Sequence, residues 1–390
     1  MGEKNILEKR EKLRQVNAFA VISIFFLYSL TTLPGLYVDQ GVLTIGLSVV
    51  LYLPIILQNL MILYKKSILR AMMIEVFVLV VLLIQDLIYV QYSKAIHESI
   101  IYLVTIGTIG LFVGSFEFRL KDCVKYGQPL SYICAVTSLI YLWLVPNKFL
   151  MSMRFGYAIL PSVMWFLLMA VHKRSLFSFI LFVVGLVVTV AWGSRGALLA
   201  ILFFVLLFFL KYHKVVFAVV SILSIPFLGL FRGSMLSIFN WIANVTHARK
   251  IEKIITMFEE NSLEDSSSGR DVLYDRCVDL ISQNPMGNGV GWWSVDPFMG
   301  GLFPHNIFLQ VGTEFGIVGL AILIFVLIVS VKKLFSFGNV EFLMLIYVFS
   351  ITIGRLMVSS MFWARLEFWL FLALFLCAGL KENNAIIVKQ

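Results

Sequence analysis

Charged residues are scarce in this chain. Lysine, arginine, aspartate and glutamate make up 14% of the 390 residues, whereas hydrophobic residues make up 60%. A soluble globular domain carries about 25% charged residues. One core cannot bury so much apolar surface, so a mean hydropathy of +0.95 predicts a polytopic membrane protein.

Several motifs of other protein classes are also missing. The four cysteines form no Cys-x-x-Cys pair and no cysteine–histidine ligand spacing, so we expect neither a disulfide framework nor a metal site. No Gly-x-x-x-x-Gly-Lys-[Ser/Thr] segment occurs. The glycine run in "NPMGNGVGWW", residues 284–293, follows no strand, which argues against a nucleotide site. We therefore expect no cofactor.

The apolar residues gather in stretches long enough to cross a bilayer as helices, for which about 20 residues suffice. We predict twelve spans, at residues 16–36, 41–64, 69–91, 98–116, 128–146, 156–171, 175–193, 196–212, 214–231, 305–331, 339–360 and 363–380. The alternating period of a spanning β-barrel is absent. The predicted fold is an all-α polytopic membrane protein with one large external loop.

Lysine and arginine recur in alternate loops, beginning with the N-terminus. The basic loops carry Lys65, Lys66 and Arg70; Arg119, Lys121 and Lys125; Lys173 and Arg174; Lys211 and Lys214; Lys332 and Lys333; and Lys381. This asymmetry places both termini in the cytoplasm. The net charge of +9 then reflects topology and attraction to anionic membrane lipid, with no nucleic-acid partner.

The chain divides into five parts on this topology: a basic cytoplasmic N-terminus at 1–15, nine spans within 16–231, an external loop at 232–304, three spans within 305–380 and a cytoplasmic tail at 381–390. Apolar spacing in the loop predicts amphipathic helices at 247–260 and 269–283. The glycine-rich stretch after them is predicted to be irregular, with Trp292 and Trp293 at the membrane interface.

Basic residues on the predicted external side run against the topology rule. They are Arg195, Arg232, Arg270, Arg355, Arg365 and His305. Guanidinium groups pair with phosphate oxygens in a bidentate manner and stay charged, so such a set suits a pyrophosphate. No Asp-x-Asp cluster lies on that face to hold a divalent metal. The alternative is that these side chains snorkel to lipid phosphates.

Three segments in this order resemble the O-antigen ligase and polysaccharide polymerase family: "WGSRGALLA", "SGRDVLYDRCVDLISQNPMGNGVGWW" and "PHNIFLQVGTEFGIVGL". The family motif is His-Asn, nine residues, then Gly-x-x-Gly. Here His305-Asn306 is followed by residues 307–315, then Gly316 and Gly319. The resemblance covers residues 185–330, and "FWARLEFW" at 362–369 looks similar to the family's last helix pair.

The resemblance implies a GT-C-like, metal-independent glycosyltransferase of the bacterial inner membrane. Such enzymes take a glycan from undecaprenyl diphosphate on the external face. Ligases pass it to the lipid A core, and polymerases pass it to another lipid-linked repeat unit. Arg195 and Arg270 match the family's pyrophosphate-binding arginines, Arg365 matches less closely, and His305 matches the catalytic histidine.

The residues of the third segment fit that role physically. A helix N-terminus disfavours imidazolium, so His305 would stay neutral and could accept a proton from a sugar hydroxyl. Asn306 can cap the first amides, and Pro304 is tolerated at a helix start. At about 100° per residue, Gly312, Gly316 and Gly319 lie within about 40° of His305, whereas Glu314 points to the opposite side. Such a glycine row predicts close approach of another helix, which would anchor His305.

Two other functions remain open from the sequence. We favour a polymerase over a ligase on the look of "FPHNIFLQ" and of the hairpin at 339–370. A transporter of lipid-linked oligosaccharides would show internal repeats with broken helices near the membrane midplane, and no internal repeat is visible in the sequence.

The predicted topology can be tested by thiol labelling. A cysteine that replaces Ser267 should react with a membrane-impermeant reagent in intact cells, because residues 232–304 are predicted to be external. A cysteine in place of Lys381 should react only after permeabilisation. Labelling of the Ser267 variant only in permeabilised cells would invert the topology.

Overall fold

The computed structural model of the chain describes residues 3–62, 66–145, 152–192, 195–215 and 270–377. Most of these residues are helical, and none of them lies in a strand. The helices are α1 (Glu3–Thr32), α2 (Gln40–Ile62), α3 (Lys66–Ile88), α4 (Ser93–Tyr102), α5 (Thr108–Ser115), α6 (Leu120–Leu144), α7 (Ser152–Lys173), α8 (Leu176–Trp192), α9 (Arg195–Tyr212), α13 (Arg270–Gln283), α14 (Ile307–Phe335), α15 (Asn339–Leu356) and α16 (Leu366–Leu372). A π-helical segment, Leu103–Gly107, joins α4 to α5, and another, Ala373–Cys377, extends α16.

The first eight and the last three predicted spans fall on these helices. Most of the ninth, at 214–231, and the amphipathic helix predicted at 247–260 lie outside the described residues. Within the described part, seven helices are long and apolar enough to cross a membrane, and three shorter helices are apolar as well. The protein is therefore an all-α, multi-pass membrane protein. The helix predicted at 269–283 is α13.

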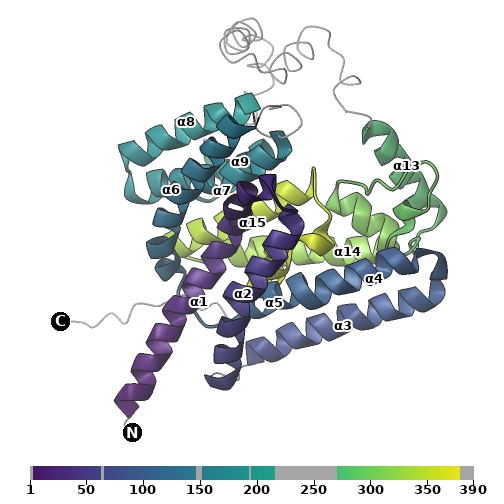
Figure 1. The fold of residues 1–390 in the computed structure, drawn as a ribbon, viewed down its shortest axis with the longest axis horizontal. Helices are drawn as coiled ribbons and strands as arrows, with labels where there is room; N and C mark the ends of the chain where they lie inside the picture. Colours follow the sequence, from purple (N-terminus) through teal and green to yellow (C-terminus); the bar gives the residue numbers. More distant parts are fainter. Residues whose placement is uncertain (1–2, 63–65, 146–151, 193–194, 216–269, 378–390) are drawn as a thin grey trace, which may run out of the picture.

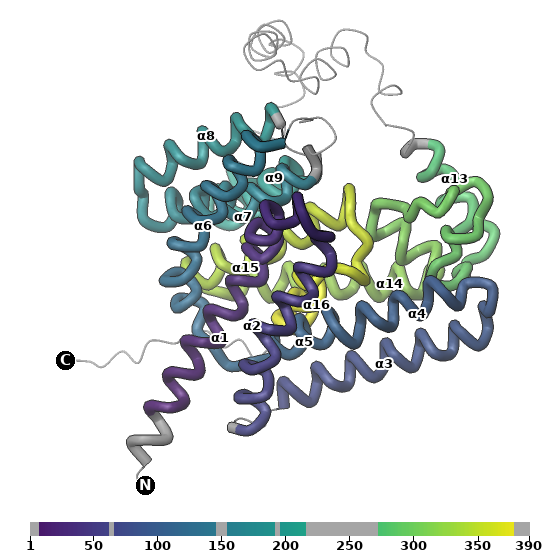
Figure 2. The backbone as a smooth tube through the Cα atoms, in the orientation of Figure 1, coloured from purple at the N-terminus to yellow at the C-terminus, as the bar shows by residue number. Residues whose placement is uncertain are grey.

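The helices fall into a buried centre and an outer layer. α6 to α9 gather on one side, α3, α4, α13 and α14 on the other, and α1 and α2 cross between them (Figure 1). α1, α7 and α15 are mostly buried, whereas only 17–22% of the most apolar stretch of α2, α3 and α14 is buried. The tube in Figure 2 shows α3 and α4 running side by side below α14. A helix that exposes apolar side chains suits contact with lipid.

Basic side chains connect the loops of the predicted cytoplasmic face. Arg14 pairs with Glu117, and Arg119 pairs with Glu11. Lysine side chains there donate to backbone carbonyl groups of other segments: Lys211 to Phe335, and Lys333 to Leu374 and Phe375. These contacts bring alternate loops to one face of the molecule, as the predicted topology requires. That this face lies in the cytoplasm stays a prediction.

Helix α14 breaks at Gly316, where the backbone angles are φ 67° and ψ −161°. The break leaves carbonyl and amide groups of the helix without their helical hydrogen-bond partners. Backbone groups of the loop 284–291 form hydrogen bonds with them instead. Three backbone hydrogen bonds make the junction: Ile317 N to Pro285 O at 2.8 Å, Asn288 N to Thr313 O at 2.7 Å, and Gly289 N to Glu314 O at 3.2 Å. The loop thus replaces the bonds that the helix loses.

Glycine is required on both sides of this junction. Gly287 has φ 94°, and a Cβ atom there would lie 2.6 Å from the carbonyl oxygen of Glu314. A Cβ atom at Gly316 would lie 2.1 Å from the carbonyl oxygen of Pro285. Gly287 therefore packs against α14, whereas Gly289 and Gly291 of the same run pack against Tyr89 and Ala95.

The predicted row of glycines on one helical face is wrong beyond Gly316, because the angular estimate assumed an unbroken helix. Gly312 faces Ile281 of α13, and Gly319 faces Phe315 of its own helix. Among the described residues, Gly312 therefore allows close packing of α13, and Gly316 allows close packing of the backbone of the loop 284–291. Neither contacts a further spanning helix.

Replacement of Gly316 by alanine should destabilise the protein. The positive φ costs a side chain about 1–2 kcal/mol, and the clash with Pro285 adds to this cost. The measurement is the midpoint of thermal unfolding in detergent. Gly46→Ala in α2 is the matched control, because a Cβ atom there meets nothing within 4 Å and alanine favours a helix by about 0.5–1 kcal/mol. An unchanged midpoint for Gly316→Ala would contradict this account of the break.

Candidate functional site

A small apolar cluster holds the segment that leads into α14. It consists of Cys277 and Leu280 of α13 together with Trp292 and Met299. Trp292 is only 2% exposed, so its predicted place at the membrane interface is wrong. The indole is buried because α13 folds back against residues 292–299. This cluster attaches the segment before α14 to α13.

A salt bridge reinforces this attachment. Arg276 of α13 donates to Asp296 at 2.9 Å, and the amides of Phe298 and Met299 donate to the other oxygen of the same carboxylate. Burial opposes ionisation of Asp296, but the hydrogen bonds from Arg276 and from these amides hold the pKa of the carboxyl group below its ordinary value. Burial also raises the pKa of the Cys277 thiol to about 12. No motif marked Arg276 and Asp296 in the sequence, because ionic pairs between distant residues leave no local pattern.

His305 lies immediately before the N-cap of α14, in a constrained conformation. Its φ is 55°, which is costly for a side chain other than glycine. Its ring packs on Phe303 with the ring centroids 4.0 Å apart, and Trp293 packs edge-on against Phe303 at 6.3 Å. Strained backbone of this kind persists where the surrounding structure enforces it. The imidazole is therefore held by aromatic packing rather than by a helical position.

Asn306 caps α14 as predicted. Its side-chain oxygen accepts from the amides of Phe308 at 2.9 Å and Leu309 at 3.3 Å. The helix begins at Ile307, so Pro304 lies outside it and does not occupy the first turn. The two capped amides belong to the positive end of the helix dipole, next to the imidazole.

Glu314 does not point away from the site, as the helical angle had suggested. It is 1% exposed, and its carboxylate accepts from Gln310 at 3.0 Å and from the indole of Trp363 at 3.1 Å. Trp363 belongs to the turn Phe362–Ala364, which directly precedes Arg365. The helix of His305 and the turn of Arg365 are thus joined through one side chain.

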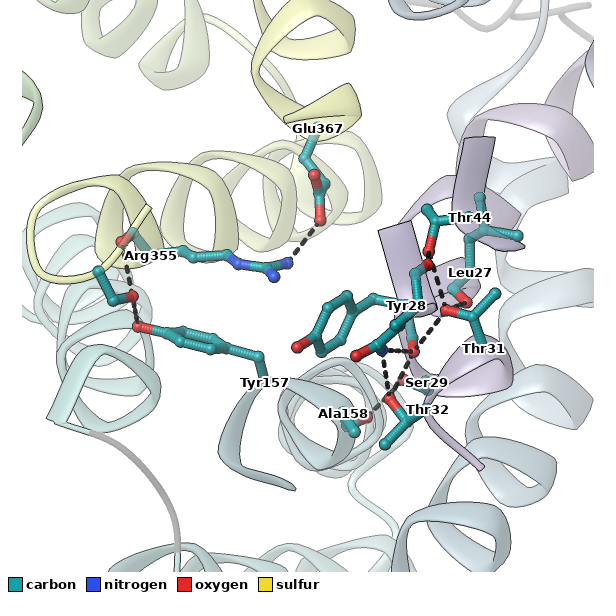
Figure 3. A network of polar contacts seen from close by, with 12 residues as sticks. Leu27, Tyr28, Ser29, Thr31, Thr32, Thr44, Tyr157, Ala158, Arg355 and Glu367 are labelled. Atoms are coloured by element: carbon teal, nitrogen blue, oxygen red, sulfur yellow. Dashed lines mark hydrogen bonds and ion pairs between the residues drawn. The ribbon is translucent and has the colours of Figure 1, made fainter. Parts of the chain in front are cut away.

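A buried cationic cluster lies between α15 and α16. Arg355 is 5% exposed and pairs with Glu367 at 2.9 Å, and its guanidinium lies 4.4 Å and 4.7 Å from the ring centroids of Tyr28 and Tyr157 (Figure 3). Arg365 is half-buried. Its guanidinium interacts electrostatically with the charges of Arg355 and Glu367. The cluster contains two guanidinium groups and one carboxylate, so it has excess positive charge and suits an anion.

The start of α9 adjoins this cluster. A Cβ atom at Gly196 would lie 2.0 Å from the hydroxyl oxygen of Tyr157, and that hydroxyl shares a hydrogen bond with Ser359 of the turn after α15. Arg195 is the first residue of α9, so its backbone lies close to Tyr157. The sequence predicted Arg355 only as one of several basic residues on the external side, with no role of its own. The structure shows it at the centre of this cluster.

Arg270 is the first residue of α13. The side chains of Arg195 and Arg270 are outside the described part of the structure, so their contacts with the cluster stay predictions. Among the described residues, no group of three or more histidine, cysteine, aspartate and glutamate side chains gathers to hold a metal ion. In the described part, α14 begins after an imidazole and a capping asparagine, and the same helix is joined through Glu314 and Trp363 to the turn that precedes Arg365.

Comparison with known proteins identifies one segment of the chain. Residues 177–324 match a family model described as O-antigen ligase. The matched segment includes α8, α9, α13 and the first part of α14, and with them Arg195, Arg270 and His305. Residues 177–324 are therefore similar to the O-antigen ligase and polymerase family, whose members act on lipid-linked glycans. No curated protein and no solved structure matches the chain.

Proposed function

We propose that the protein is a glycosyltransferase that takes a glycan from undecaprenyl diphosphate at the external face of the bacterial inner membrane. One observation carries the proposal. Within the segment that matches the family, His305 stands at the capped N-terminus of α14, and α14 is joined to the turn that bears Arg365. The imidazole of His305, as a base, and the guanidinium of Arg365, as a cation, are thus carried by two segments that a hydrogen bond connects.

The reaction that this arrangement supports is displacement at the anomeric carbon of the donor glycan. The acceptor hydroxyl forms the new glycosidic bond, and its proton passes to the neutral imidazole of His305. The bond to the phosphate oxygen breaks, and undecaprenyl diphosphate leaves with the electron pair. Arg195, Arg270 and Arg365 stabilise the charge of this leaving group. The positive end of α14 keeps the imidazole neutral before the transfer.

The acceptor that we propose is another lipid-linked repeat unit, which makes the protein a polymerase of O-antigen or capsule. The support is the resemblance of "FPHNIFLQ" and of the hairpin at 339–370. The alternative acceptor is the lipid A core, which would make it a ligase. Both acceptors present a sugar hydroxyl, so the same base and the same cations serve either.

Transport of a lipid-linked oligosaccharide is the more distant alternative, and the break in α14 is a feature that a transporter would share. In transporters, however, the freed backbone groups of broken helices hold the substrate or a coupling ion. Here the loop 284–291 occupies those groups, which favours the enzyme.

Replacement of His305 by alanine should abolish glycan transfer. A general base contributes about 10²–10⁴-fold to the rate. Arg195→Lys should also impair transfer, because an ammonium group cannot form the bidentate pair of a guanidinium. The measurement is the glycan ladder on a gel at matched protein levels in the membrane. Lys121→Arg, in the first turn of α6 at the predicted cytoplasmic face, is the control and should leave the ladder unchanged.

The same gel separates the two acceptors. A defective polymerase leaves single repeat units, whereas a defective ligase leaves long chains on undecaprenyl diphosphate. Ladders of wild-type length from both His305→Ala and Arg195→Lys would refute the proposed site.

Transfer should continue in excess chelator, because arginine side chains are proposed to neutralise the pyrophosphate. The measurement is ladder formation in isolated membranes with EDTA, compared with untreated membranes. Loss of the ladder with EDTA, and its return with Mg²⁺ or Mn²⁺, would show that a metal takes part.

A further inference from the structure

The carboxylate of Glu314 is buried inside the protein without a cation against it among the hydrogen bonds and salt bridges of the described residues. It is 1% exposed, and its oxygens accept from Gln310 at 3.0 Å and from Trp363 at 3.1 Å. A buried carboxylate is costly unless such bonds compensate its lost hydration. Glu314 neither accepts the proton nor stabilises the leaving group in the proposed reaction, so the free-energy cost of burying its carboxylate calls for another explanation.

One side of Glu314 leads to Arg365. The indole of Trp363 donates to the carboxylate, and the carbonyl group of Trp363 accepts from Trp369 at 3.2 Å. The amide of Arg365 bonds the carbonyl group of Phe362 at 3.1 Å, so Arg365 leaves a closed turn that Trp363 anchors. The position of the Arg365 guanidinium therefore depends on where Glu314 holds this turn.

The other side of Glu314 leads to His305. The indole of Trp293 and the amide of Gly291 lie beside the same carboxyl group. Trp293 packs on Phe303, and Phe303 packs on the imidazole of His305. The carbonyl group of Glu314 also accepts from the amide of Gly289. The loop that supports His305 is thus held to the same residue as the turn of Arg365.

We propose that Glu314 is a positioning residue that sets the distance between the imidazole of His305 and the guanidinium of Arg365. The inference rests on the proposed function, because His305 acts on the attacking oxygen and Arg365 on the leaving oxygen, on either side of the anomeric carbon. A displacement of about 1 Å at a reacting centre can cost about 10²-fold in rate. A carboxylate suits this task because it only accepts hydrogen bonds, and both of its partners are donors.

Because Gln310 and Glu314 lie one helical turn apart and bond to each other, the role of the carboxylate can be tested by exchanging these two side chains. In Glu314→Gln, an amide of the same size presents its own N–H₂ group to one of the two donors, so one hydrogen bond is lost. In the double variant Gln310→Glu, Glu314→Gln, the amide at 314 donates to the new carboxylate at 310 and accepts from Trp363. Both bonds return, although the carboxylate has moved to the preceding turn.

The experiment measures initial rates of glycan transfer by the purified full-length protein in nanodiscs, with an undecaprenyl-diphosphate-linked glycan as donor. For Glu314→Gln, kcat should fall at least about tenfold while the KM for the donor changes less, because alignment rather than binding is lost. The double variant should recover most of kcat. Glu98→Gln, an exposed glutamate in α4, is the matched control and should behave as the wild type.

Three outcomes would decide against the inference. A wild-type kcat in Glu314→Gln would show that the carboxylate does not position the site. A double variant as slow as Glu314→Gln would show that a carboxylate is needed at 314 itself. If Glu314→Gln fails to fold, Trp363→Phe takes its place, since it removes the indole donor and keeps an aromatic ring, and an unchanged kcat there has the same meaning.

The same assay separates this inference from the proposed function. Wild-type protein that transfers no glycan, or His305→Ala with an unchanged rate, would refute the proposed function. An active wild type that depends on His305 but not on Glu314 would refute only the positioning role.

Discussion

Backbone groups freed inside a membrane protein must find partners, and this requirement shapes the site. α14 breaks at Gly316, and the amides and carbonyl groups that the break exposes have no water to bond in an apolar surrounding. The loop 284–291 supplies the partners and is thereby drawn against α14. Because residues 292–304 continue from this loop, the approach of the chain to His305 is determined by the same junction.

The buried charges depend on that geometry in turn. Glu314 precedes the break by two residues and meets donors from its own helix and from the turn 362–364. Arg355 and Glu367 then pair beside two tyrosine rings, with Arg365 next to them. Glu314, Arg355 and Glu367 each have a polar or aromatic partner from a different segment. The cationic cluster and the imidazole are therefore parts of one connected framework, which is why we propose that they act in one reaction.

The spanning helices were predictable because their signal is local. About 20 apolar residues suffice to cross a bilayer, and such stretches are visible without knowledge of their neighbours. The cap at Asn306 and the helix α13 were likewise predicted from short patterns, and both are confirmed. The burial of Trp292 and the direction of Glu314 were predicted wrongly. Both depend on segments that are distant in the sequence, and on a helix break that an unbroken period of 3.6 residues does not allow.

The amino-acid sequence by itself determined the membrane class, the positions of most helices and the family segment, since these follow from composition, apolar length and three ordered motifs. It also named His305 and the arginines as candidates. Only the tertiary structure decided why the glycines are where they are, which loop closes the break in α14, and that Arg355 and Glu314 belong beside the candidate site. The physical reason is that hydrogen bonds and ion pairs between distant segments are chosen by the packing of the whole chain, whereas hydrophobicity and helix capping act over one or a few turns.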